Sequence, residues 1–250
     1  MKSKNILIFS LILNGIALFY IWRNSTMSPT EEAPEKQHIF LNESEIDSIK
    51  REASTATLIK VFGGYKITKE SIFEAMPNRK EEIIFLGNSI TDNCNWHELL
   101  GNPNVINRGI SGDKIEGILS RLDEIVESKP KKIFLMVGIN DFRKKRTSTQ
   151  ILMDYERLIK EIKEKTSHTE LYIQSILPTK MKGYNNKDII KVNNGLKQLS
   201  IKHRCEYINL FDLFKDDNNE MNMEFSIEGI HLNGKGYLLW KEAIVKYVKS

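Results

Sequence analysis

The chain has 250 residues, of which 40% are hydrophobic and 28% are charged, so it is long enough for one globular domain with a sizeable core. Its 37 basic and 33 acidic residues are mixed along the sequence and give a net charge of only +4. This mixture is typical of solvated surfaces and argues against a nucleic-acid-binding protein.

The first predicted element precedes the main domain. Lys2 and Lys4 stand before an apolar run at residues 6–22, which has the minimum length, about 17 residues, of a membrane-spanning helix. The basic start would keep the amino terminus in the cytoplasm and export the rest. We therefore expect residues 1–23 to be an uncleaved signal anchor, with a cleaved signal peptide as the alternative. The protein would then face the periplasm or the cell exterior, bound to the membrane through this segment only, or be secreted if the segment is cleaved.

Two further segments separate this run from the main domain. Residues 24–37 are polar and contain two prolines, which is typical of a tether. Residues 38–80 carry apolar side chains such as Tyr65 and Phe73, so we expect them to pack on the core of the main domain, which we assign to residues 81–250.

Short apolar runs alternate with longer helical patterns after residue 80. The runs predict strands at Ile83–Leu86, Val105–Asn107, Lys132–Val137, Leu171–Ile176 and Tyr207–Leu210. The helical patterns predict helices at Asn95–Leu100, Lys114–Ser128, Thr149–Lys165, Lys187–His203 and Gly234–Val248. Such alternation predicts an α/β fold with a mainly parallel, five-stranded sheet covered by helices on both faces. Functional groups should gather at the carboxyl ends of the strands.

Three polar motifs each follow a predicted strand. Ser89 lies in GNSIT at residues 87–91, where its hydroxyl would point away from the sheet, although an isolated serine there is more often a helix cap. Gly112 ends the NRGISG motif at residues 107–112, and its N–H would be able to donate to an oxyanion. Asn140 carries a neutral amide that would stabilise developing negative charge, with a simple turn asparagine as the structural alternative.

The fourth motif is EGIHLN at residues 228–233. His231 would serve as a general base toward a serine, and it needs a partner on its other ring nitrogen to fix the tautomer. Glu228, three residues earlier, would supply that partner if the segment forms a turn. A single histidine near a helix start is more often structural, so each motif taken alone is weak.

The sequence does not indicate metal or disulfide chemistry. Cys94 and Cys205 lie far apart without C-x-x-C spacing, and the five histidines form no H-x-x-x-H pair, so we expect free thiols and no catalytic metal. Asp141 is expected to order its loop. The basic run at residues 143–146 predicts a solvated loop, with attraction of an anionic substrate as the alternative.

Taken together, the four motifs resemble the SGNH (GDSL-type) hydrolase family, which is named for a serine, a glycine, an asparagine and a histidine in separate blocks. The resemblance covers about residues 80–250 and implies a flavodoxin-like three-layer α/β/α sandwich. It also implies acyl-enzyme chemistry without a cofactor, with Ser89 as nucleophile and His231 as base. The Ser89 N–H, the Gly112 N–H and the Asn140 side chain would form the oxyanion hole.

Two positions depart from the family pattern. Asn88 stands where the first block usually has aspartate, and Glu228 stands where the histidine block usually has aspartate. Glutamate serves this orienting role in other triads, so Glu228 is retained as the third catalytic residue. Asn88 and Arg108 lie within the first two motifs and are assigned as candidate substrate-binding residues.

Several segments resemble exported bacterial esterases that act on acetylated sugars, including sialate O-acetylesterases, and the platelet-activating-factor acetylhydrolase branch. This resemblance predicts a serine esterase that removes O-acetyl groups from carbohydrate, sialic acid among the candidates, with a small-molecule or glycan ester as its partner. A lysophospholipase or thioesterase, a non-catalytic glycan-binding module on the same fold, and a membrane-tethered scaffold are the alternatives. The sequence leaves the oligomeric state open.

Overall fold

The computed structural model describes residues 63–143 and 146–249. The predicted signal anchor at residues 1–23 and the tether at residues 24–37 lie outside these ranges. Residues 63–75 of the predicted pre-domain segment are helical and are hereafter the leading helix. No helix within the described ranges has both the length and the apolarity that a membrane crossing requires.

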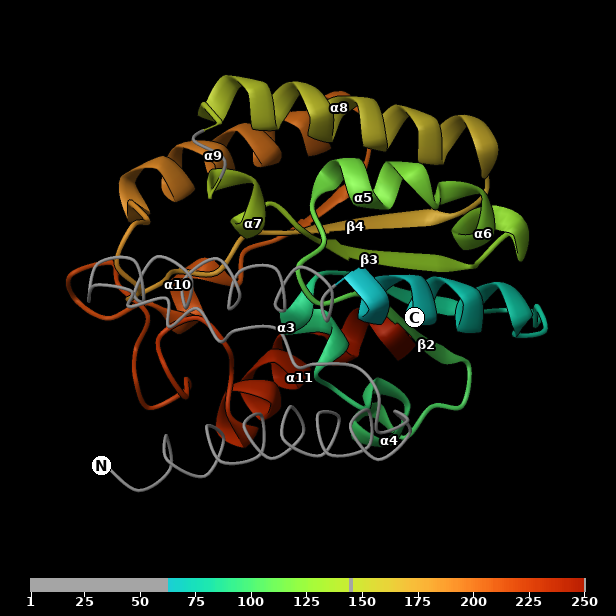
Figure 1. Cartoon of the computed structure of the whole chain (residues 1–250), viewed down its shortest axis with the longest axis horizontal. Coiled ribbons are helices and arrows are strands. Elements are labelled where there is room, and N and C mark those ends of the chain that lie inside the picture. Colours follow the sequence, from blue (N-terminus) through green and yellow to red (C-terminus); the bar gives the residue numbers. More distant parts are fainter. Residues whose placement is uncertain (1–62, 144–145, 250) are drawn as a thin grey trace, which may run out of the picture. The chain divides into compact units, whose positions relative to one another are not determined.

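Five parallel strands form the centre of the fold (Figure 1). They are β1 (Ile83–Gly87), β2 (Val105–Gly109), β3 (Lys132–Met136), β4 (Glu170–Gln174) and β5 (Glu206–Ile208). Their order across the sheet is β2-β1-β3-β4-β5, which is the flavodoxin-like order. The chain reverses its winding direction at β1, and ligands bind α/β sheets at such switch points. The predicted five-stranded parallel sheet is therefore confirmed.

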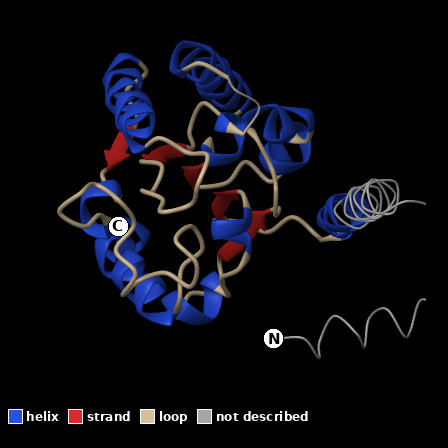
Figure 2. Ribbon diagram, turned by 60° about the vertical axis from the view of Figure 1, so that its left-hand side comes forward, coloured by secondary structure: helices blue, strands red, loops and turns tan. Residues whose placement is uncertain are grey.

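Helices cover both faces of this sheet (Figures 1 and 2). Besides the leading helix, the described helices are α3 (Ser89–Asp92), α4 (Trp96–Leu100), α5 (Ile115–Ser120), α6 (Leu122–Glu127), α7 (Ile139–Phe142), α8 (Ser148–Lys165), α9 (Asn186–Lys202), α10 (Phe211–Phe214) and α11 (Gly234–Lys249). In Figure 1, α5, α8 and α9 lie on one side of the sheet, and α4 and α11 lie on the other. The predicted three-layer α/β/α arrangement is confirmed.

The helix predicted at Lys114–Ser128 is broken in two. Arg121 leaves the helical conformation, with φ −118° and ψ 17°, and separates α5 from α6. Its guanidinium turns inward, where it pairs with Asp113 and donates to the backbone oxygen of Arg108 at 2.8 Å. These buried polar partners lie elsewhere in the sequence, so the apolar spacing alone predicted one continuous helix.

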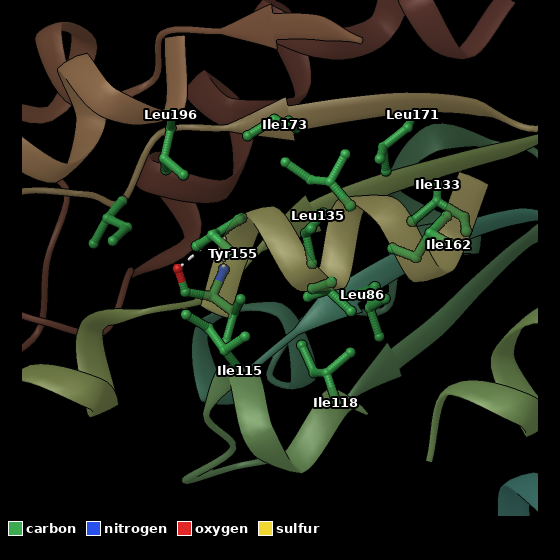
Figure 3. Packing of buried hydrophobic residues seen from close by; sticks show 14 of the residues in the cluster. Leu86, Ile115, Ile118, Ile133, Leu135, Tyr155, Ile162, Leu171, Ile173 and Leu196 are labelled. Atoms are coloured by element: carbon green, nitrogen blue, oxygen red, sulfur yellow. Dashed lines mark hydrogen bonds between the residues drawn. The ribbon is translucent and has the colours of Figure 1, made fainter. Parts of the chain in front are cut away.

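Two apolar cores fix the sheet between the helical layers. Alternate residues of β1 point to opposite faces: Leu86 joins the core beneath α5, α8 and α9, and Phe85 joins the core beneath α4 and α11. Figure 3 shows the first of these cores, in which the buried hydroxyl of Tyr155 is satisfied by the backbone of Val137. In the second core, Phe85 stacks on Trp96 with ring centroids 4.2 Å apart.

A glycine brings the first short helix against the sheet. A Cβ atom at Gly109, the last residue of β2, would lie 2.4 Å from the backbone nitrogen of Asp92, which ends α3. Such a distance is far inside van der Waals contact, so a side chain at this position would push α3 away from the strand. Since α3 begins at Ser89, this close approach helps to set the position of the candidate nucleophile.

A buried carboxylate joins two of the loops at the carboxyl edge of the sheet. Asp141 in α7 is 1% exposed, accepts from the N–H of Ile115 at the start of α5, and pairs with Arg146 at 3.4 Å. Desolvation by burial raises the pKa of Asp141 from 3.8 to about 6, against the opposing effects of Ile115, Arg146 and Lys114. The role predicted for Asp141, ordering its loop, agrees with these contacts.

We predict that Asp141→Asn makes stability less dependent on pH. Because the pKa of Asp141 is raised to about 6 in the folded protein, its contribution to stability is complete below about pH 4 and is lost as pH rises through about 6. From pH 4 to pH 7, the variant should therefore gain roughly 1–3 kcal/mol in free energy of unfolding relative to wild type. Urea denaturation at several pH values measures this difference, and a constant difference would contradict the assignment.

Candidate active site

Ser89 begins the four-residue helix α3, directly after β1. Asn88 caps this helix from an extended conformation, and its side chain accepts from the N–H of Ile90 at 3.0 Å. The carbonyl groups of α3 are held from other elements: Tyr237 donates to the oxygen of Ile90, and Trp96 donates to the oxygen of Thr91, each at 2.8 Å. A helix this short has little stability of its own, so these side-chain bonds define its position.

The half-buried Ser89 lies within hydrogen-bond reach of His231. The distance from Ser89 Oγ to His231 Nε2 is 2.9 Å, and His231 Nδ1 is hydrogen-bonded to Glu228 Oε1. An ionised carboxylate only accepts, so Nδ1 carries the proton and Nε2 is the acceptor for the serine hydroxyl. This is the tautomer that a general base requires.

The loop that carries Glu228 and His231 is tied together internally. The hydroxyl of Ser226 donates to the backbone oxygen of His231 at 2.7 Å and accepts from the N–H of Gly229 at 2.9 Å. The backbone oxygen of Gly229 accepts from the Lys180 N–H at 2.8 Å, in the segment that follows β4. The turn that the sequence required between Glu228 and His231 is therefore present, and it is hydrogen-bonded to the loop that follows β4.

Gly112 and Asn140 lie on the loops after β2 and β3, the two strands that flank β1. Gly112 has φ +84°, a conformation that favours glycine. Asn140 is 8% exposed, and its side-chain amide donates to the backbone oxygen of Asp113 at 2.9 Å. The amide has a second N–H, which remains available to an oxyanion. Ser89, Gly112 and Asn140 all line one cleft, so the arrangement can present three donors to a developing negative charge.

This cleft has a volume of about 560 Å³. Its lining comprises Ser89, Asn93, Ser111, Gly112, Asn140, Arg143, Met181, Lys182, Gly183, Tyr184, Glu228, Ile230 and His231. It therefore contains all of the predicted catalytic and oxyanion residues, together with two cations, Arg143 and Lys182, that the sequence had not singled out individually. Desolvation raises the pKa of Tyr184, and the nearby charge of Arg143 opposes that effect.

Two predicted substrate-binding residues lie outside the cleft lining. Asn88 is buried and caps α3. Arg108 is buried as well, donates to Glu124 at 2.7 Å, and has its guanidinium 4.7 Å from the ring centre of Phe73. Both side chains hold the fold, and neither lines the cleft, so the structure does not bring Asn88 and Arg108 together with the other predicted site residues.

Asp113 does not cap the helix that follows it, α5. Lys114 holds the capping position of α5, and the Asp113 carboxylate pairs with Lys66 and Arg121 instead. Cys94 and Cys205 are both free thiols, and burial raises the pKa of Cys94 to about 12. Within residues 63–143 and 146–249, no group of three His, Cys, Asp or Glu side chains is placed to hold a metal ion.

Two supporting residues, Asn107 and Asp92, were not predicted from the sequence. The amide of Asn107 donates to the backbone oxygens of Thr91, Asp92 and Cys94 at 2.9–3.1 Å, which fastens the α3–α4 turn to β2. The Asp92 carboxylate accepts from both the N–H and the hydroxyl of Ser111, next to Gly112. Asn107 lies inside the NRGISG motif and Asp92 lies three residues after Ser89, and these positions were the only sequence signals of a supporting role. Their hydrogen-bond partners become adjacent only in the fold.

Comparisons with known proteins agree with this geometry. A family model described as the GDSL-like Lipase/Acylhydrolase family matches residues 85–239. The chain is 25% identical over 107 residues to platelet-activating factor acetylhydrolase IB subunit alpha1 of Bos taurus, which covers 40% of this chain and 45% of that protein. It is 22% identical over 173 residues to N-acylneuraminate cytidylyltransferase of Escherichia coli O18:K1:H7, covering 67% of this chain and 40% of that protein. The chain thus spans less than half the length of these relatives.

Solved structures share the fold. A protein from Streptococcus pneumoniae described as a platelet activating factor has a TM-score of 0.72 and 23% identity, covering 79% of this chain and 99% of that one. An acetyl-xylooligosaccharide esterase from Geobacillus stearothermophilus has a TM-score of 0.57 and 16% identity, covering 69% and 96%. At these identities the likeness concerns the fold alone.

Asn140→Ala should reduce kcat for ester hydrolysis by about 10²–10³-fold, because it removes an oxyanion donor that acts in the transition state. Steady-state kinetics on a p-nitrophenyl ester measures this, with thermal denaturation to verify that loss of the bond to Asp113 leaves the fold intact. Asn194→Ala, at an exposed position of α9, is the matched control. A kcat close to wild type would remove Asn140 from the oxyanion site.

Glu228→Ala should lower kcat by about 10-fold or more with a smaller change in KM, because it disturbs the orientation of His231 and leaves substrate contacts in place. Glu224→Ala tests an exposed carboxylate that pairs only with Lys235 among the described residues and should be neutral. An unchanged kcat in Glu228→Ala would exclude this carboxylate from the mechanism.

Proposed function

The chain belongs to the GDSL-like lipase/acylhydrolase family, and from that premise we propose that it is a carboxylic ester hydrolase that removes O-acetyl groups from carbohydrate through an acyl-enzyme on Ser89. The observation that carries this proposal is the continuous hydrogen-bonded relay from Ser89 through His231 to Glu228, in the same cleft as Gly112 and Asn140.

The proposed chemistry has two steps that use the same groups. Ser89 Oγ attacks the acetyl carbon while His231 Nε2 takes the hydroxyl proton. The carbonyl oxygen becomes negative and is met by the N–H groups of Ser89 and Gly112 and by the amide of Asn140. Collapse breaks the bond to the sugar oxygen, which receives the proton from His231. Water then attacks the acetyl-enzyme by the same route and releases acetate.

Two comparisons support acetyl as the transferred group. One relative is named a platelet-activating factor acetylhydrolase, and one structural neighbour is named an acetyl-xylooligosaccharide esterase. The two names differ in the molecule that carries the acetyl group and share only the acetyl group itself. The acetyl preference therefore has support from both names, whereas the preference for a carbohydrate has support from only one of them.

The charge of the cleft supports an acidic sugar among the possible carbohydrates. Among the described residues, Arg143 and Lys182 pair with no carboxylate, whereas the neighbouring Arg146 and Lys180 both do. Unpaired cations beside a reaction centre attract anionic substrates. The Escherichia coli relative is named for an N-acylneuraminate, which is an acidic sugar. The predicted export through residues 1–23 would bring this site to glycans outside the cytoplasm.

Hydrolysis of p-nitrophenyl esters from acetyl to octanoyl, by wild type and by Ser89→Ala, tests the acetyl proposal. We expect turnover to be greatest for acetyl and to disappear in the variant. A preference for longer acyl chains would favour a lysophospholipase or thioesterase. Absence of Ser89-dependent turnover on every ester, with retained glycan binding, would favour the binding module.

Acetylated sialic acid and acetylated xylo-oligosaccharide then test the alcohol portion. If the cations select an acidic sugar, Arg143→Gln and Lys182→Gln should raise KM for acetylated sialic acid and leave p-nitrophenyl acetate hydrolysis unchanged. Equal effects on the acidic and the neutral sugar would contradict charge recognition.

A further inference from the structure

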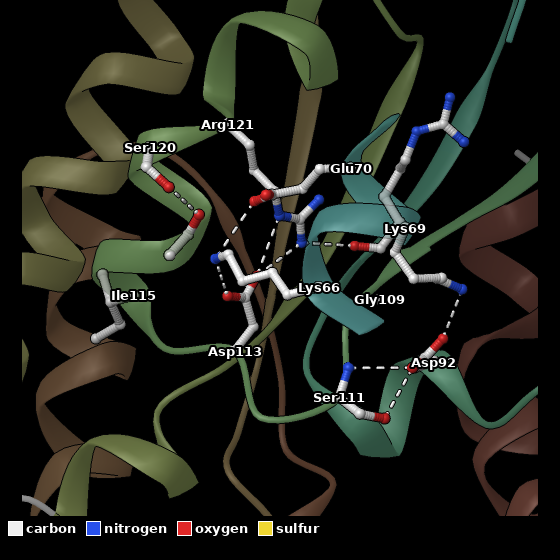
Figure 4. A network of polar contacts seen from close by, with 12 residues as sticks. Lys66, Lys69, Glu70, Asp92, Gly109, Ser111, Asp113, Ile115, Ser120 and Arg121 are labelled. Carbon is white, nitrogen blue, oxygen red and sulfur yellow. Dashed lines mark hydrogen bonds and ion pairs between the residues drawn. The ribbon is translucent and has the colours of Figure 1, made fainter. Parts of the chain in front are cut away.

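Ser111 and Asp113, the neighbours of Gly112 in the sequence, are each held by residues from outside their own loop (Figure 4). On one side, the N–H and the hydroxyl of Ser111 donate to Asp92 Oδ2 at 3.0 and 2.8 Å. On the other side, the carboxylate of Asp113 binds Lys66 and Arg121, each at 3.0 Å. The direction of the Gly112 N–H therefore depends on how firmly Asp92 and Asp113 are fixed.

The leading helix supplies two further hydrogen-bond donors to Asp92. Lys69 donates to Asp92 Oδ1 at 2.8 Å, and the hydroxyl of Tyr65 donates to Asp92 Oδ2 at 2.5 Å. With the two donors of Ser111, this carboxylate accepts four hydrogen bonds while its side chain is only 4% exposed. Burial alone would raise the pKa of Asp92, but the bonds from Lys69, Tyr65 and Ser111 outweigh it and hold the pKa below its ordinary value.

The same helix reaches Asp113 and is anchored by an aromatic side chain. Lys66 forms an ion pair with Asp113, whose side chain is 2% exposed. Lys66 also pairs with Glu70, one turn later in the same helix. Phe73 is buried, with the guanidinium of Arg108 4.7 Å from its ring centre and that of Arg121 5.9 Å away. Aromatic burial with stacked cations fixes the helix against the domain from which Asp92 and Asp113 project.

These contacts differ in kind from surface ion pairs. Lys160 on α8 is exposed and is one of three partners of Glu156, so losing its ion pair would cost little. Removing Lys69 would instead leave a desolvated carboxylate with one oxygen unpaired, and such a group recruits other donors or water. Recruitment of another donor or of water by Asp92 would shift Ser111, and Gly112 would move with Ser111.

We propose that the leading helix is a positioning element of the oxyanion site, in which Lys69 and Tyr65 act through Asp92 on Ser111, and so set the direction of the Gly112 N–H. The helix precedes residue 85, where the match to the family model begins, so it adds to the catalytic core from outside that match. The inference rests on the proposed function for the identity of the oxyanion donors. Its kinetic consequence is specific: displacing an oxyanion donor weakens transition-state binding more than substrate binding, so kcat falls while KM changes little.

The test is steady-state hydrolysis of p-nitrophenyl acetate by the full chain carrying Lys69→Met, with Lys160→Met as the matched surface control. We expect kcat to fall about 10-fold or more in Lys69→Met with KM within about twofold, and no change in the control. Lys69→Arg, which keeps the charge and the donors, should recover most of kcat. A wild-type kcat in folded Lys69→Met would overturn the proposal, as would equal losses in the Met and Arg variants.

If Lys69→Met does not fold, Tyr65→Phe tests the positioning role of the leading helix. It removes one hydroxyl from a side chain that is 38% exposed, and it should lower kcat several-fold without a matching change in KM. An unchanged kcat in this variant would overturn the proposal.

The rate of Ser89 labelling by a fluorophosphonate separates this inference from the proposed function, because that reaction needs the same oxyanion donors but no natural ester. Labelling that slows in Lys69→Met and Tyr65→Phe supports the positioning role even if no ester is turned over. Wild-type chain that neither labels nor hydrolyses would contradict both proposals.

Discussion

The parallel pairing of β1 with both β2 and β3 is the constraint on which the site depends. Because the three strands run in the same direction and are in register, the loops that follow them leave the sheet at one edge. Ser89, Gly112 and Asn140 each belong to one of those loops. Because apolar cores bury both faces of the sheet, this edge is where polar groups can contact substrate. The parallel sheet therefore determines both the packing of the helices and the position of the site.

Buried carboxylates convert this general arrangement into a defined geometry. The side chains of Asp92, Asp113 and Asp141 are almost inaccessible to solvent, and each accepts from residues far away in the sequence. Each carboxylate is therefore hydrogen-bonded by fixed protein donors in place of water, and it joins separate loops. Fixed loops hold the oxyanion donors in position before the reaction, as oxyanion stabilisation requires. Glu228 is different: it is exposed and lies three residues from its partner His231, so a local turn suffices to place it.

The sequence predicted those features that local patterns encode. The strand run Ile83–Leu86 is apolar at every position, and Ser89, Gly112 and Asn140 each come soon after a predicted strand. The break at Arg121, the buried position of Arg108 and the role of Asp92 were not predictable in this way. Each depends on a partner that is distant in sequence, such as Lys69, 23 residues before Asp92. A charged residue inside a motif suggests substrate contact, and only tertiary packing reveals that Arg108 serves Glu124 and Phe73 instead.

The central claim is that Ser89 becomes covalently acylated with the help of His231. Acid quenching during turnover of p-nitrophenyl acetate, followed by peptide mass mapping, measures this most directly. The account predicts one acetyl group on the peptide that contains Ser89, formed much more slowly in His231→Ala and absent in Ser89→Ala. Acetyl groups on another residue, or equal acylation of wild type and His231→Ala, would contradict it.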